Sequence, residues 1–235
     1  MRNALVIGLA LMMWGAARVS WATDKDAARL ENSAEVLTDI MRTPEKGIPH
    51  DLLNKSVCVG IIPSELKGAF GLGGSFGRGV LVCRRGGDGP WGAPSMFTVG
   101  GVNFGFQIGG QATDFVLLVM NGRGAEKLLR DKVKLGADAS AAAGPVGRTA
   151  QGATDLQLRA EILTYSRSRG IFAGVSLDGQ IFKQDDDAND KLYGRHIAPQ
   201  DILFKGAVGV PPAGAALDAE LIKYSPRGGE AFRPK

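Results

Sequence analysis

Glycine content is the feature that most limits what this chain can fold into. The 235 residues include 34 glycines, about twice the usual share, and fifteen of them fall between Gly68 and Gly110. Each glycine inside a helix costs about 1 kcal/mol relative to alanine, so this segment is not expected to be helical. Strands with tight turns and bulges tolerate such density. The middle of the chain is therefore predicted to be β-sheet.

The rest of the sequence predicts one α+β domain rather than two. Hydrophobic residues make up 44% of the chain, enough for a packed core, and no linker or fixed-period repeat divides it. We expect a glycine-rich, mainly antiparallel and barrel-like sheet with a few peripheral helices, its core at about 52–204. Strand patterns cover 57–62, 80–83, 96–102, 104–108, 115–120, 156–166 and 170–177. Pro63 is expected to end the first strand, and Asp178-Gly179 is a hairpin signal before Ile181.

Two longer helices are expected outside the glycine-rich region. Residues 25–41 carry an apolar stripe at helical spacing, with charged residues on the other face. Residues 212–224 have a similar pattern with Leu217, Leu221 and Tyr224 on one side. Shorter helices are predicted at 49–54, 124–132 and 199–204.

The first 22 residues have the features of a secretory signal peptide. Arg2 supplies the positive start, an apolar run follows to Trp14, and Ser20-Trp21-Ala22 suits cleavage before Thr23. An N-terminal membrane anchor is the alternative, but Arg18 interrupts the run short of about 20 apolar residues. We expect a mature domain of residues 23–235, exported to the periplasm or the extracellular space.

The charge balance excludes a general nucleic-acid binder. The formal net charge is +4, and loss of the signal peptide would leave 26 basic and 24 acidic residues. That balance is too mild for nucleic acid, and it would not repel an anionic surface.

Two cysteines, Cys58 and Cys83, each lie in an apolar, strand-like run. Export would allow a disulfide between them. Two buried thiols fit the sequence equally well, because a sequence does not report the Cα separation that a bridge needs.

Residues suited to catalysis are scarce. Gly73-Gly74-Ser75-Phe76-Gly77 matches the G-x-S-x-G nucleophile elbow, and Asp187 and His196 follow in the right order. That elbow requires a helix after the serine, whereas a strand pattern follows here. We therefore interpret the motif as a glycine-rich β turn and expect no enzyme activity.

Metal ligands are also poorly represented. His50 and His196 lack a zinc-site spacing, and the two cysteines are 25 positions apart. Asp185, Asp187 and Asn189 copy half of a calcium loop whose remaining key positions are not matched, so we interpret them as a solvated acidic turn. We expect no metal and no cofactor.

Several arginines lie beside predicted turns, where a guanidinium can present two donors to a phosphate group. Arg167 and Arg169 flank Ser168 just before Gly170, so both could face one ligand. The candidate head-group contacts are Arg78, Arg148, Arg167 and Arg169.

Several separated blocks of sequence, occurring in the same order, resemble the SYLF domain family. They include Gly71–Arg85 (GLGGSFGRGVLVCRR), Ala142–Arg148 (AAGPVGR) and Tyr165–Leu177 (YSRSRGIFAGVSL), and the similarity runs from about Leu52 to Phe204. The resemblance implies a β-rich fold with outer helices and lipid binding without catalysis. Eukaryotic members are linked to phosphoinositide-rich membranes and actin, and bacterial members are exported, often as lipoproteins.

The predicted N-terminal helix departs from the family pattern. Eukaryotic members are thought to touch membranes through a basic amphipathic helix, but residues 24–42 hold five acidic and three basic residues. This helix is expected to pack on the sheet, with a membrane contact as the alternative.

These observations support three hypotheses for function. The first is binding of a phospholipid or a membrane surface by an exported protein. The second is a structural or protein-interaction module of the cell envelope with a protein partner. The third and weakest is a serine hydrolase built on Ser75.

Overall fold

Four long neighbouring strands form the centre of the fold, in a computed structural model that describes residues 21–42, 47–70, 72–103, 109–147, 159–168 and 171–226. They pair antiparallel in the order β3-β2-β1-β4. Their bounds are Cys58–Phe70 for β1, Leu72–Cys83 for β2, Ser95–Asn103 for β3 and Gly109–Val119 for β4. The glycine-dense segment is thus sheet, as its composition predicts.

Five shorter strands extend this centre to both sides. Beyond β3 lie β9 (Ile181–Gln184) and β5 (Val133–Lys134); beyond β4 lie β7 (Ile162–Ser168) and β6 (Ala141–Ala143), and β8 (Ile171–Gly174) pairs with β7. Every pairing is antiparallel except that of β6 with β7. The two ends of the strand order, β5 and β6, are joined by residues 135–140, where Gly136 N–H donates to the Ala139 carbonyl at 2.8 Å. The sheet therefore curls strongly, and the predicted α+β fold with a mainly antiparallel, sheet-dominated core is confirmed.

Two cores lie on opposite faces of the curled sheet. The inner face carries Leu81, Phe97, Phe115, Leu117 and Phe182, and the rings of Phe97 and Phe182 stack with centroids 4.3 Å apart. The outer face presents alternate residues, among them Val59, Ile61, Val80, Val116 and Leu118, to a layer of helices. Period-two alternation along each strand supplies both faces.

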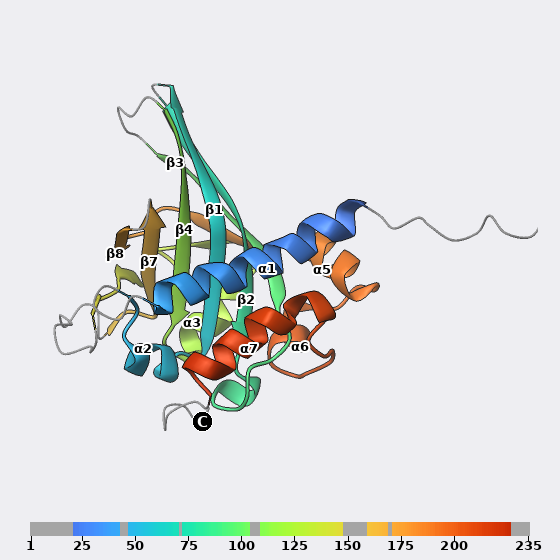
Figure 1. Ribbon diagram of the computed structural model, residues 1–235. Coiled ribbons are helices and arrows are strands. Elements are labelled where there is room, and N and C mark those ends of the chain that lie inside the picture. The colour runs from blue at the N-terminus through green and yellow to red at the C-terminus, as the bar shows by residue number, and fades with distance from the viewer. Residues whose placement is uncertain are drawn as a thin grey trace, which may run out of the picture.

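Helices cover the outer face at one end of the long strands (Figure 1). The helices are α1 (Trp21–Met41), α2 (His50–Lys55), α3 (Gly122–Leu128), α5 (Asp186–Tyr193), α6 (Pro199–Leu203) and α7 (Ala215–Tyr224), with 3-10 turns at η1 (Arg85–Gly87) and η3 (Pro212–Gly214). Ala125 and Leu128 of α3 and Leu203 of α6 belong to the inner core instead. All five predicted helices are present, with α3 shorter than expected. Within the described ranges, none of these helices combines the length and apolarity needed to cross a membrane.

The long strands project beyond the helical layer. Figure 1 shows the hairpin ends of β1, β2, β3 and β4 extending past α1, while the opposite ends lie among the helices. The predicted strand at 104–108 lies outside the described residues. We call the four strand ends away from the helices the projecting end.

Pro63 does not end β1, contrary to the sequence-based expectation. The strand continues to Phe70, and the register with both neighbours shifts by one residue between Ile62 and Glu65. Ser64 has a positive φ of 55°, and its N–H donates to Asp114 Oδ1 at 2.9 Å. Proline is tolerated at such a bulge because no ladder bond is required of it there.

The predicted hairpin at Asp178-Gly179 is also wrong. The chain turns there, with Gly179 at φ 84°, but β8 pairs with β7 whereas β9 pairs with β3 and β5. The backbone of the turn bonds to a distant residue instead: Gly179 N–H donates to the Leu135 carbonyl, and Leu135 N–H donates to the Gln180 carbonyl, each at 2.8 Å. A turn signal fixes the local bend but not the partner of the strand that follows.

The acidic run at residues 185–187 begins a helix rather than forming a solvated turn. The Asp185 carboxylate accepts a hydrogen bond from the Ala188 N–H at 3.4 Å and so caps α5. Asp186 and Asp187 occupy the first turn, where negative charge is favourable beside the helix N-terminus.

Cys58 and Cys83 form a disulfide. They are directly paired residues of β1 and β2 with Cα atoms 4.0 Å apart, and both side chains are fully buried on the inner face. The bridge joins the two central strands at the end opposite the projecting end. Of the two alternatives left open by the sequence, the disulfide is the one observed.

Gly79 is the tightest glycine position in the central sheet. A Cβ atom at residue 79 would lie 2.3 Å from Phe97 Cζ and 2.7 Å from the Ile61 carbonyl oxygen. The Phe97 ring thus fills the space that any other residue at 79 would need. Gly74, on the same strand, has open space instead, with the nearest atom at 4.0 Å.

Gly79→Ala is expected to lower the free energy of unfolding by about 3 kcal/mol, because the methyl group collides with both a buried ring and backbone. Urea denaturation followed by circular dichroism measures the change. Gly74→Ala is the matched control and should stay within about 0.5 kcal/mol of the parent. Equal effects of the two substitutions would contradict the packing described for Phe97.

Removing the disulfide with Cys58→Ala and Cys83→Ala together is expected to destabilise the protein by about 3.5 kcal/mol, since the bridge closes a loop of 25 residues in the unfolded chain. Denaturant titrations with and without a strong reductant provide the measurement. The reductant should affect only the parent protein. A parent that responds to neither reductant nor substitution would show that the bridge does not form.

Candidate functional site

Of the four arginines expected to contact a head group, two lie in the described part of the chain. Arg78 on β2 is exposed, and Arg167 on β7 is half-buried. Arg148 and Arg169 lie outside the described residues, so the expected pairing of Arg167 with Arg169 has no geometry to report.

Arg167 contacts carboxylates of its own chain. Its Nη1 atom lies 2.5 Å from Asp39 Oδ2 on α1 and 3.7 Å from Asp114 Oδ2 on β4. These contacts tie the C-terminal half of α1 to the sheet. Contact of Arg167 with a lipid head group stays a prediction, and any such ligand would compete with these two carboxylates.

Arg84 is a structural cation rather than a surface one. Its side chain is fully buried, with Nη2 donating to the Ser225 carbonyl at 3.0 Å and the guanidinium 4.0 Å from the centre of the Trp91 ring. Burial lowers the pKa of Arg84 to about 10, so the group remains charged at neutral pH. Arg84 thus holds Ser225, the residue that follows α7, against the end of the sheet that carries the disulfide.

Arg78 lies beside an exposed aromatic ring. Residues 74–78 of β2 alternate between exposed and buried, which places Phe76 and Arg78 together on the outer face. The Phe76 side chain is 51% exposed, and the Arg78 guanidinium carbon lies 6.0 Å from the centre of its ring. An exposed aromatic side chain indicates a binding surface where it belongs to a wider patch.

Strand register extends this pair into a patch over three strands. Phe76 pairs with Gly100 of β3, which pairs with Ile181 of β9, a residue that is 45% exposed. Two residues further from the projecting end, Arg78 pairs with Thr98, which pairs with Lys183. We call this set of six the β2–β3–β9 patch: Phe76, Arg78, Thr98, Gly100, Ile181 and Lys183.

The charged members of the patch, Arg78 and Lys183, are both basic and both exposed. Sequence reasoning selected Arg78 but missed Ile181 and Lys183. Their signal was the alternation Ile181-Phe182-Lys183-Gln184, which marks a strand with one exposed face. The sequence does not show that Ile181 and Lys183 share a face of the sheet with Phe76 and Arg78, which lie about one hundred positions earlier.

Ser75 does not have the setting of a catalytic nucleophile. It lies within β2, paired with Lys67 on one side and Gly101 on the other, so the predicted glycine-rich turn at 73–77 is wrong. The Ser75 side chain is 6% exposed, and its Oγ has no hydrogen-bond partner among the described residues. A nucleophile elbow needs a sharp turn from strand to helix, which a residue within an antiparallel strand cannot supply.

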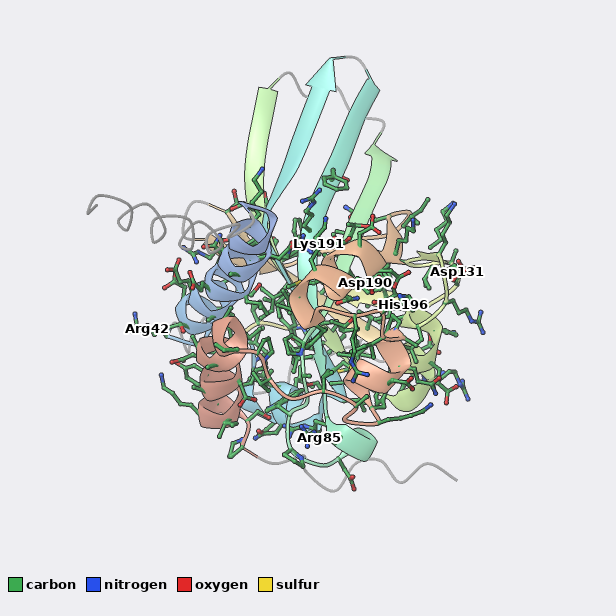
Figure 2. The ribbon with its side chains drawn as sticks, turned by 90° about the vertical axis from the view of Figure 1, so that its right-hand side faces the viewer. Arg42, Arg85, Asp131, Asp190, Lys191 and His196 are labelled. Atoms are coloured by element: carbon green, nitrogen blue, oxygen red, sulfur yellow. A yellow bond between two sulfur atoms is a disulfide. The ribbon has the colours of Figure 1, made fainter. Side chains whose placement is uncertain are left out.

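Among the described residues, neither His50 nor His196 forms a hydrogen bond with Ser75. His196 is exposed, and its Nδ1 lies 3.0 Å from Asp190 Oδ1; Figure 2 shows these two side chains beside each other next to α5. His50 on α2 is exposed, with its ring 6.1 Å from that of Tyr224.

The acidic residues compared with a calcium loop have structural roles. Besides capping α5, Asp185 pairs with Arg29 of α1 at 3.2 Å, and buried Asn189 accepts a hydrogen bond from Met96 N–H at 2.7 Å. Among the described residues, no group of three or more histidine, cysteine or acidic side chains could hold a metal ion.

Helix α1 packs against the sheet, as the sequence favoured. Leu30 and Leu37 are fully buried in the outer core. Ion pairs hold the helix near its middle, through Arg29 with Asp185, and near its C-terminal end, through Asp39 with Arg167. The apolar stripe of α1 is therefore occupied by the protein's own core.

Comparison with known proteins places these residues in a family. The family model described as "Ysc84: Las17-binding protein actin regulator" matches residues 100–224. Human SH3 domain-containing YSC84-like protein 1 is 36% identical over 162 residues, which cover 68% of this chain and 47% of that protein. LAS seventeen-binding protein 3 of Saccharomyces cerevisiae is 35% identical over 190 residues, covering 77% of this chain and 40% of that protein.

A fission yeast relative, SH3 domain-containing protein PJ696.02 of Schizosaccharomyces pombe, is 38% identical over 156 residues, or 65% of this chain and 36% of that protein. The chain thus spans less than half the length of each of these curated relatives.

Leu37→Ala is expected to lower the free energy of unfolding by about 3 kcal/mol, because it leaves a cavity between α1 and the sheet. Thermal and urea unfolding measure the loss. Glu35→Ala, an exposed position on the same helix, serves as the control and should change stability by less than about 0.5 kcal/mol. A stable Leu37→Ala variant would mean that α1 is not docked in solution.

Proposed function

Since the chain belongs to the Ysc84 (SYLF) family, whose description refers to binding and regulation, we propose that it is a non-catalytic module that binds phospholipid at a membrane surface. The observation that carries this proposal is the exposed Phe76 ring beside Arg78 on the projecting part of the sheet. Residues from two further strands, Ile181 and Lys183, extend the same surface.

The chemistry of the patch suits a lipid surface better than a soluble anion. An arginine fork matches two oxygens of a phosphate group, and a lysine adds a point charge. Neither interaction requires exposed apolar side chains. Phe76 and Ile181 gain free energy only if the ligand also offers an apolar region, as the boundary between head groups and acyl chains does.

The disulfide supports the proposal that the protein is exported. Bridges between buried cysteines persist in oxidising compartments such as the periplasm and the extracellular space, and are rare in the cytosol. Cys58 and Cys83 form such a bridge, and residues 1–22 have the sequence pattern of a signal peptide. We propose cleavage near Ala22, in the first turn of α1, and a location in the cell envelope or outside it.

A second candidate function is docking of an envelope protein on α7. Ile222 on this helix is 47% exposed, and Lys223 and Glu220 beside it form an ion pair at 3.0 Å. A stable partner recovered from envelope extracts without lipid, and lost in an Ile222→Asp variant, would favour this function.

The purified chain is expected to co-sediment with vesicles of phosphatidylcholine and phosphatidylglycerol, to bind pure phosphatidylcholine more weakly, and to dissociate as salt screens the charges. Arg78→Gln should weaken binding to anionic vesicles about fivefold, the effect of one basic residue near such a surface. Arg195→Gln, an exposed arginine elsewhere on the surface, is the control and should bind like the parent.

Absence of binding to both kinds of vesicle would refute the lipid-binding function. Equal losses for Arg78→Gln and Arg195→Gln would instead show that net charge matters and that the position of the charge does not.

A further inference from the structure

The β2–β3–β9 patch consists of two parallel rows with different chemistry. The apolar row is Phe76, Gly100 and Ile181, and the basic row is Arg78, Thr98 and Lys183. In each strand the two rows are two residues apart, so their side chains share the outer face and the rows are separated by about 7 Å. Across the strands, the backbones of Arg78 and Lys183 are about 10 Å apart, with Thr98 between them.

The apolar row lies nearer the projecting end on all three strands. β2 runs away from the projecting end towards the disulfide at Cys83, so Phe76 precedes Arg78 along that direction. β3 and β9 keep the same order through their pairing, with Gly100 and Ile181 further out than Thr98 and Lys183. Figure 1 shows the long strands β2 and β3 extending beyond the helices on that side.

Gly100 gives the apolar row its shape. A Cβ atom at this position would lie 3.7 Å from Phe76 Cδ2, so the Phe76 ring lies beside the bare backbone of β3. Gly100 is half-buried and contributes no side chain to the space between Phe76 and Ile181. The apolar row therefore has no side chain at its centre and no polar side chain between Phe76 and Ile181.

Two long segments near this end of the sheet carry no charge, whereas β1 has Glu65 and Lys67 in the same region. No charged residue occurs from Phe97 to Thr113, nor from Gly68 to Gly77. These segments include the hairpin ends of β2, β3 and β4. A surface of negative phosphates would therefore meet no carboxylate from these segments.

We propose that the projecting end of the sheet, rather than helix α1, docks on an anionic phospholipid membrane, with the apolar row in the acyl boundary and the basic row at the lipid phosphates. This inference rests on the proposed membrane-binding function and assigns its surface and orientation. The separation of about 7 Å between the rows matches the depth of about 5–10 Å to which interfacial segments bury their apolar face. Thr98 lies between the two cations, and its hydroxyl donates to the Lys183 carbonyl at 3.5 Å.

Helix α1 and helix α7 are the competing contact surfaces. The apolar stripe of α1 is buried in the outer core, so membrane contact through it would require the helix to leave the sheet. α7 exposes Ile222, but the residue beside it, Lys223, is already paired with Glu220. The β2–β3–β9 patch needs no rearrangement to present both apolar and basic groups.

Tryptophan fluorescence can locate the contact. In vesicles of phosphatidylcholine and phosphatidylglycerol, Phe76→Trp should show a blue-shifted emission and quenching by lipids brominated in the acyl chain, measured against the parent's own tryptophans. Ile222→Trp is the matched control, since its exposure is similar, and Asn32→Trp reports on the exposed face of α1. Neither control should be quenched more than the parent.

Affinity measurements test the two rows separately. Arg78→Gln with Lys183→Gln should weaken binding to anionic vesicles about 30-fold, through the loss of two basic residues near the surface. Phe76→Ser should weaken it about tenfold, through the loss of buried apolar area. Ile222→Ser should leave it unchanged. Because the substituted side chains are exposed, each variant is expected to fold. Thermal unfolding followed by circular dichroism verifies this.

The outcomes separate this inference from the function on which it rests. Vesicle binding that survives all of these patch substitutions, together with quenching at residue 32 or 222 instead of 76, would overturn the docking orientation and leave membrane binding intact. If the parent protein binds no vesicle, the proposed function fails and the inference fails with it.

Discussion

The fit of Phe97 over Gly79 is the packing constraint on which the curled sheet depends. The ring lies where a side chain at residue 79 would be, and it stacks on Phe182 of β9. One interaction thus joins β2, β3 and β9 on the inner face. The outer face of the same three strands carries the β2–β3–β9 patch, whose rows are defined by the pairings of these strands. The packing of Phe97 on the inner face and the arrangement of the β2–β3–β9 patch on the outer face therefore depend on the same register of β2, β3 and β9.

Much of the fold could be predicted because its signals are local. Glycine density indicated the sheet, helical spacing indicated α1 and α7, and the sequence blocks indicated the family, which the comparisons confirm. The errors at Pro63 and Asp178-Gly179 share one cause: a local signal shows that the chain bends, but not which strand it meets next. The disulfide and the partners of Phe76 stayed open for the same reason, since register decides both.

Helix α1 shows how charge can fix a helix in place instead of attracting a ligand. Its acidic and basic residues reach α5 and the sheet through Arg29 and Asp39, while its apolar stripe fills the outer core. Because both its polar and its apolar faces contact the rest of the protein, α1 has few side chains available to contact a membrane. This arrangement moves the exposed combination of apolar and basic side chains to the sheet, where a search for amphipathic helices would not find it.

The extra residue in β1 between Ile62 and Glu65 reverses the phase of that strand. Even-numbered residues of β1 pair with odd-numbered residues of β2 before the bulge, as Gly60 does with Leu81, whereas odd pairs with odd beyond it, as Lys67 does with Ser75. The two halves of β1 therefore pair with their neighbours in different phase, although they form one strand. Deleting one residue at the bulge would give β1 a single phase while both halves keep their present neighbours, so the change of phase comes from one extra residue and not from the pairing of either half.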